Sequence, residues 1–146
     1  MGRTTRVGAR LGALAALVYV AQMPGAASQA GEALATVNIP RAVMADGQSL
    51  AAGTYGLRVS TDAVTPVVGQ SPDGARWVEF VRSGQSRGRE LATVLAGDAV
   101  AAVVQGPRPA SGAARVELLK GGEYLRVWIN QGGTHYLIHL AVAPGH

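Results

Sequence analysis

The chain has 146 residues, no cysteine, and 13 basic residues against 9 acidic ones, a formal net charge of +4. Without cysteine, neither a disulfide bond nor a cysteine-linked lipid is available to it. Three arginines lie in the first 30 positions, so residues 31–146 have ten basic residues against nine acidic ones. The nearest approach to a basic cluster there is Arg82, Arg87 and Arg89, in an expected loop. Nucleic-acid binding needs a clustered basic surface, and we therefore expect none.

Residues 1–30 have the three parts of a secretory signal peptide. Three arginines begin the segment, an apolar run follows at 11–21, and small residues lead up to Ala30. The apolar run is shorter than the roughly 20 residues that a membrane-spanning helix needs. We expect a signal-peptide helix that is removed by cleavage after Ala30, or alternatively after Ala27, with a retained membrane anchor as the other interpretation. The mature protein would then be periplasmic or extracellular, with no membrane span.

Residues 31–146 are expected to form a single β domain, because short apolar runs alternate with turn residues along the whole segment. Gly97 and Asp98 interrupt the one stretch, 90–104, for which a helix is the alternative. We predict an antiparallel β-sandwich of about seven to nine strands, with a small closed β-barrel as the alternative. A polar loop is expected at 83–88, and the expected strands are 33–39, 41–45, 54–60, 64–69, 77–82, 90–95, 99–104, 115–119, 123–130 and 134–142.

The last two expected strands form a hairpin whose register follows from Gly132 and Gly133. Paired glycines supply the positive φ angles of a two-residue hairpin loop. With these glycines at the tip, three apolar pairs share one face, which should be the core: Leu125 with Leu140, Val127 with Ile138, and Ile129 with Tyr136.

The opposite side of this hairpin combines aromatic rings with hydrogen-bonding groups, which often marks a binding surface. We expect it to bind a protein or glycan partner, unless another segment such as 31–45 covers Trp128 and Leu137. The candidate binding residues, called the hairpin face below, are Tyr124, Arg126, Trp128, Asn130, His135 and His139.

His135 and His139 are spaced four residues apart, which on a helix would suit one metal ion. On a strand the same spacing separates them by roughly 13 Å, which is too far for one zinc ion. We therefore expect no metal site, and no glycine-rich phosphate loop predicts a cofactor.

No nucleophile elbow is present, and no facing pair of carboxylates can be recognised in the sequence. We therefore expect an exported, non-enzymatic binding or interaction module. One alternative is a structural or assembly protein of the cell envelope that pairs through strand edges. A hydrolase with an unrecognised site is the third interpretation.

Residues 50–55 read LAAGTY, with Leu50, Ala52, Gly53, Thr54 and Tyr55 matching a recurring segment and Ala51 standing where proline is usual. The segment resembles the L-P-A-G-T-Y stretch of small exported bacterial β-domains of unknown function. The resemblance covers about a third of residues 31–146, including 37–48 and the final hairpin. It implies an exported β-sandwich or barrel in which a strand begins at Gly53 and Tyr55 packs inward, and it implies no catalytic residue.

Overall fold

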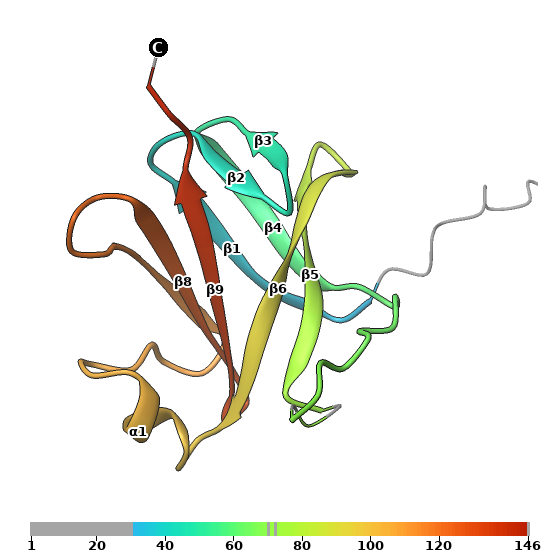
Figure 1. The fold of residues 1–146 in the computed structure, drawn as a ribbon, viewed down its shortest axis with the longest axis vertical. Helices are drawn as coiled ribbons and strands as arrows, with labels where there is room; N and C mark the ends of the chain where they lie inside the picture. The colour runs from blue at the N-terminus through green and yellow to red at the C-terminus, as the bar shows by residue number, and fades with distance from the viewer. Residues whose placement is uncertain (1–30, 70, 72, 146) are drawn as a thin grey trace, which may run out of the picture.

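The structure is a computed structural model that describes residues 31–146 with the exception of 70, 72 and 146, so the expected signal peptide lies outside the described residues. Nine antiparallel strands and one short helix, α1 (Val100–Val103), make up the described part of the chain (Figure 1). None of its helical structure is long and apolar enough to cross a membrane. The strands are β1 (Ala33–Ile39), β2 (Val43–Ala45), β3 (Gln48–Leu50), β4 (Gly53–Val59), β5 (Ala75–Arg82), β6 (Gln85–Ala96), β7 (Ala113–Leu118), β8 (Tyr124–Gln131) and β9 (Thr134–Val142).

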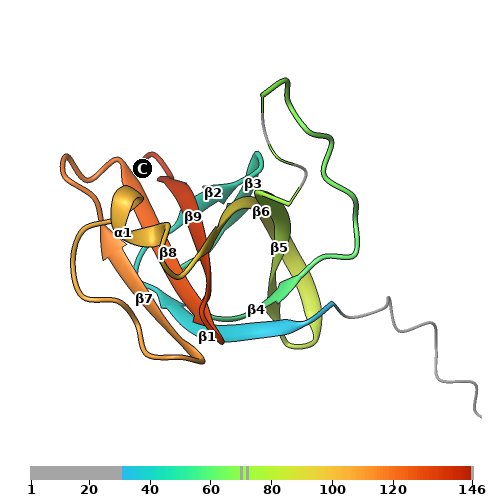
Figure 2. The same cartoon turned by 90° about the horizontal axis from the view of Figure 1, so that it is seen from below.

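All nine strands belong to one sheet that curls into a nearly closed barrel. Backbone pairing runs in the order β1-β4-β5-β6-β9-β8-β7, and the two end strands, β1 and β7, contact each other (Figure 2). β9 pairs with β6 and β2 along one edge and with β8 along the other. The all-β prediction is confirmed. The barrel alternative describes the architecture better than the sandwich, because one continuous sheet surrounds the core instead of two sheets packed face to face.

The predicted register of the final hairpin is confirmed. Leu125 pairs with Leu140, Val127 with Ile138 and Ile129 with Tyr136, and these six side chains are all buried in the main core. Gly132 and Gly133 form the tip with φ angles of 60° and 91°. Since side chains alternate between the two faces of a strand, a correct position for the hairpin tip fixes which face each residue of β8 and β9 occupies.

β4 and β5 complete the core from the opposite side of the barrel. Tyr55 and Leu57 point inward and are buried, and the Tyr55 ring meets the Phe80 ring edge-on with centroids 6.2 Å apart. Trp77 lies on the outer face of β5, where the Arg89 guanidinium stacks 4.3 Å from its ring centroid. The alternation of side chains along β5 therefore places Phe80 in the core and Trp77 on the surface, as expected for a strand.

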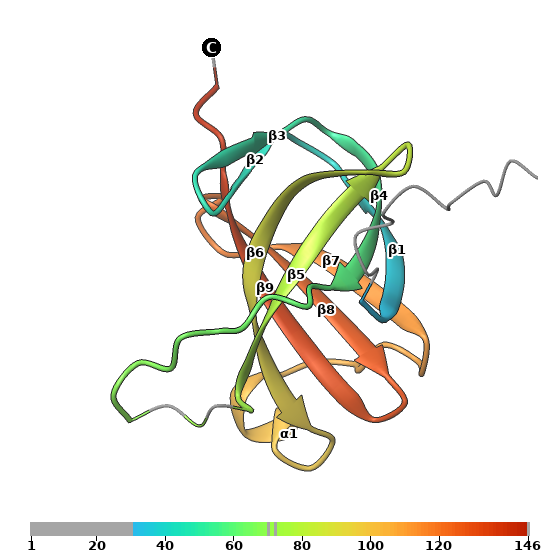
Figure 3. The same cartoon turned by 90° about the vertical axis from the view of Figure 1, so that its right-hand side faces the viewer.

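The strand predicted at 64–69 is wrong, because these residues belong to the loop that leads from β4 to β5. Pro66 has no backbone N–H to donate to a neighbouring strand, and Val68 is fully exposed. The loop extends away from the barrel (Figure 3).

The loop predicted at 83–88 is also wrong, because the chain reverses within two residues. Ser83 and Gly84 have φ angles of 52° and 73°, which is the left-handed conformation of a tight hairpin turn. β6 therefore begins at Gln85 and pairs with β5 almost from the turn onward.

The strand predicted at 99–104 is wrong as well, because residues 100–103 form one helical turn. Val100 and Val104 are four residues apart, and the Val104 N–H donates to the Val100 carbonyl at 2.8 Å. This spacing puts both valines on the same side of the turn, facing the barrel, and both are buried.

The hairpin tip gives a direct test of the register argument. Gly133→Val should lower the free energy of unfolding by about 1–3 kcal/mol, because a β-branched residue is strained at a φ of 91°. Gly56→Ala is the matched control: its backbone is extended and its new Cβ would lie 3.9 Å from the nearest atom, the Val81 carbonyl oxygen. Urea unfolding of both variants measures the difference, and equal losses would contradict the assignment of the strain to the turn.

Candidate functional site

The structure keeps all six candidate residues on the outer face of β8 and β9 but divides them into a covered group and an open group. Trp128 has no exposed surface and His135 is 2 % exposed, whereas Tyr124 is 50 % exposed. Across the hairpin, Arg126 lies opposite His139 and Asn130 opposite His135. Of the two interpretations of this face, the structure therefore supports the one in which another segment covers Trp128 and Leu137.

α1 and the residue after it cover the lower part of the hairpin face. Val100 and Val104 pack against Trp128 and Leu137, with Leu95 of β6 at the margin of this second apolar cluster. The covering segment is thus 100–104, not the segment 31–45 that the sequence suggested. Figure 2 shows α1 outside the barrel next to β8.

Under this cover, the indole N–H of Trp128 has a polar partner in His135. The Trp128 indole N–H donates a hydrogen bond of 2.8 Å to Nδ1 of His135, so Nδ1 carries no proton in this arrangement. Burial, and to a smaller degree the charge of Arg108, lower the pKa of His135 below its ordinary value. His135 therefore stays neutral and acts as a structural acceptor for the buried indole.

The upper part of the hairpin face is held by ion pairs. Glu117 of β7 lies between two guanidinium groups, since it pairs with Arg115 at 2.9 Å and also with Arg126. Desolvation by neighbouring side chains, and the charge of Arg126, lower the pKa of His139. With Arg126 engaged by Glu117, only Tyr124 and His139 remain exposed, and their role in binding stays a prediction.

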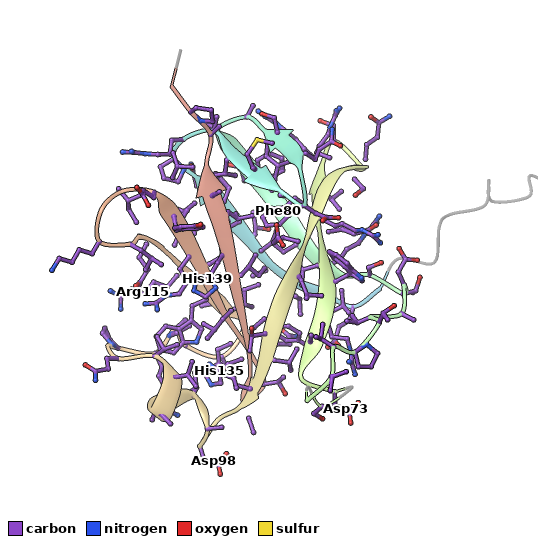
Figure 4. The ribbon with its side chains drawn as sticks, in the orientation of Figure 1. Asp73, Phe80, Asp98, Arg115, His135 and His139 are labelled. Atoms are coloured by element: carbon purple, nitrogen blue, oxygen red, sulfur yellow. The ribbon has the colours of Figure 1, made fainter. Side chains whose placement is uncertain are left out.

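The two histidines occupy different parts of β9. His135 lies next to α1, and His139 lies higher on the same strand (Figure 4). Within the described ranges, no three side chains of the metal-ligating types come together. Asn130 is also engaged, because its amide donates to the Pro109 carbonyl and accepts from the Gly133 N–H, each at 3.0 Å.

A second surface, which the sequence did not single out, lies where the β5–β6 turn approaches β3, at the upper right of Figure 1. It is an open hollow of about 420 Å³. We call it the arginine groove, and its polar lining comes from Gln48, Ser49, Tyr55, Arg82, Ser83 and Arg87.

Neither Arg82 nor Arg87 forms an ion pair within the part of the chain that the structure describes. Five other arginines do: Arg58 with Glu79, Arg76 with Asp73, Arg89 with Asp62, and Arg115 and Arg126 with Glu117. The groove lining contains no carboxylate that could neutralise these two guanidinium groups. Its electrostatic character is therefore positive.

The sequence held one usable signal for the groove. Ser83-Gly84 marks a two-residue hairpin turn, and recognising it would have placed Arg82 and Arg87 on the two arms of one hairpin. The contribution of β3 could not be read locally, because it depends on how the β2–β3 hairpin is attached to β9.

Comparison with protein-family models, with curated proteins and with solved structures gives no significant match to this chain. The resemblance of residues 50–55 to exported β-domains therefore stays a prediction.

The hydrogen bond between Trp128 and His135 predicts an acid-sensitive fold. Because the folded-state pKa of His135 is lowered, its stabilising effect is complete above the unfolded value of 6.5 and is lost as the pH falls below it. Between pH 7.5 and 5.0 this group should reduce the free energy of unfolding by at most about 1.4 kcal/mol per pH unit.

His135→Asn places an amide oxygen near the position of Nδ1 and cannot titrate, so urea unfolding of this variant should depend less on pH than that of the unmodified protein. His139→Gln is the control for the exposed histidine on the same strand. An undiminished pH dependence in His135→Asn would contradict the assignment to His135.

Proposed function

We propose that this chain is an exported, non-enzymatic binding module and that its ligand occupies the arginine groove. One observation carries the proposal: Arg82 and Arg87, both without an ion-pair partner among the described residues, line the same hollow. An arginine fork presents several donors in a fixed plane, and such donors favour a ligand with matching acceptors.

The position of the groove supports a binding role. Arg82 has the same parity along β5 as the buried Phe80, so its side chain turns toward the end of the barrel interior and stacks on Tyr55. The mouths of β-barrels are frequent ligand sites, and a hollow of about 420 Å³ is within the usual range of roughly 300–1,000 Å³.

The side chains of the groove favour binding over proton transfer. The described lining contains neither a carboxylate nor an imidazole, the groups that most often serve as general bases. The hydroxyl group of Tyr55 already donates to the Ala51 carbonyl at 2.7 Å. The signal-peptide pattern of residues 1–30 supports a periplasmic or extracellular location for this binding activity.

A thermal-unfolding screen of the purified protein against neutral, cationic and anionic sugars, amino acids and organic acids tests the proposal. At least one compound should stabilise the fold, by about 2.7 kcal/mol at a concentration one hundred times its Kd, and mass spectrometry should recover it unchanged. The double variant Arg82→Gln, Arg87→Gln should lose this stabilisation.

The matched control is Arg41→Gln, Lys120→Gln, which removes two exposed positive charges that form no ion pair among the described residues and do not line the groove. Chemical conversion of the bound compound, no stabilisation by any compound, or stabilisation that survives loss of both groove arginines would each overturn the proposal.

A second candidate function, assembly through strand edges, is favoured by the seam of the barrel. Among the described strands, β1 pairs only with β4 and β7 only with β8, so each has one edge without a strand partner there although the two contact each other. An unpaired edge is a template for a strand from another copy.

Assembly predicts a mass that rises with concentration. Light scattering of the eluting protein should then show dimers or larger species, and Thr36→Pro, which removes a backbone N–H of β1, should change their proportion. A monomer at every concentration would rule this second function out.

A further inference from the structure

The guanidinium group of Arg82 is held in place by the segment that begins β4. Its Cζ atom lies 5.6 Å from the centroid of the Tyr55 ring, a cation–π distance. A Cβ atom added to Gly53 would lie 3.0 Å from each of the two terminal nitrogens of Arg82, so the guanidinium rests against the bare glycine backbone. Two surfaces thus restrict Arg82, which reduces the conformational entropy that binding would otherwise cost.

Arg87 enters the groove because of an irregularity in β6. Phe80 pairs with Gly88 and Val81 pairs with Ser86, so Arg87 is an extra residue with no partner on β5. A β-bulge of this kind redirects side chains and often lies next to a functional site. The bulge puts Arg87 on the groove beside the restrained Arg82.

The remaining lining suits the hydroxyl groups of a ligand. Gln48 and Ser49 come from β3 and Ser83 comes from the β5–β6 turn, and their side chains both donate and accept hydrogen bonds. Glu90, a carboxylate of β6, accepts hydrogen bonds from the backbone N–H groups of Asp46 and Leu91. The groove is therefore lined by two guanidinium groups together with uncharged polar side chains.

Building on the proposed function, we infer that the arginine groove binds a sugar-sized molecule that carries a carboxylate or a phosphate group. The oxyanion is held by Arg82 and Arg87, since both kinds of oxyanion match the spacing of a guanidinium fork. The hydroxyl groups of the same molecule face Gln48, Ser49 and Ser83. Arg82 is a specificity-determining residue, and Gly53 and Tyr55 are positioning residues that act through it.

Three probes of similar size isolate the anionic group: glucuronate, glucose 6-phosphate and glucose. Each is titrated into the isotopically labelled protein at constant ionic strength, and binding is followed by the backbone amide signals of residues 48–55 and 82–88. Glucuronate, glucose 6-phosphate or both should shift these signals with a Kd at least about tenfold lower than that of glucose, because charged hydrogen bonds are stronger than neutral ones. The comparison of the two anions separates carboxylate from phosphate recognition.

Arg82→Gln and Arg87→Gln should each weaken binding of the preferred anion at least about tenfold, whereas Arg41→Gln should leave it unchanged. Both groove arginines are exposed, and an unchanged thermal midpoint shows that each variant is folded. Equal binding of glucose and the anions would overturn this inference and leave the binding function standing. Absence of binding by all three probes, or anion binding that persists in both arginine variants, would overturn it as well.

Discussion

The pairing of β9 with three other strands is the constraint on which the rest of the structure depends. One edge of β9 carries both β6 and β2, and the other edge carries β8. This shared strand joins the two halves of the barrel and attaches the β2–β3 hairpin that forms one wall of the arginine groove. The inward side chains of β9 are core residues, so the position of the groove is tied to the burial of Ile138 and Leu140.

The parts of the fold that follow from alternation could be predicted, because alternation is a property of each strand by itself. The register of β8 and β9 needed only the strand period and the tip glycines. The inward position of Tyr55 was implied by the resemblance of residues 50–55. The covered state of Trp128 could not be predicted in this way. It depends on Val100 and Val104, which are separated from it by more than twenty residues and read equally well as a strand.

The same distinction between local pattern and tertiary contact explains why the sequence predicted a binding surface at Trp128. A tryptophan beside polar residues reads as a binding surface when its strand is considered alone, yet here its indole N–H has a buried partner in His135. The arginine groove shows the reverse case, because Arg82 and Arg87 look like ordinary loop charges in the sequence. Their shared position on one hollow comes from a tight turn, a bulge and the approach of β3, and two of these three features are tertiary.

Residues 50–55 connect the fold with the groove. Gly53 has a φ of 147°, which favours glycine, and the absence of a Cβ also leaves room for the guanidinium of Arg82. Tyr55 likewise has two contacts, since its ring packs edge-on against Phe80 in the core and faces Arg82 at the barrel mouth. A segment that begins a strand therefore also shapes a surface. Selection for folding and selection for binding would therefore act on the same glycine and the same tyrosine.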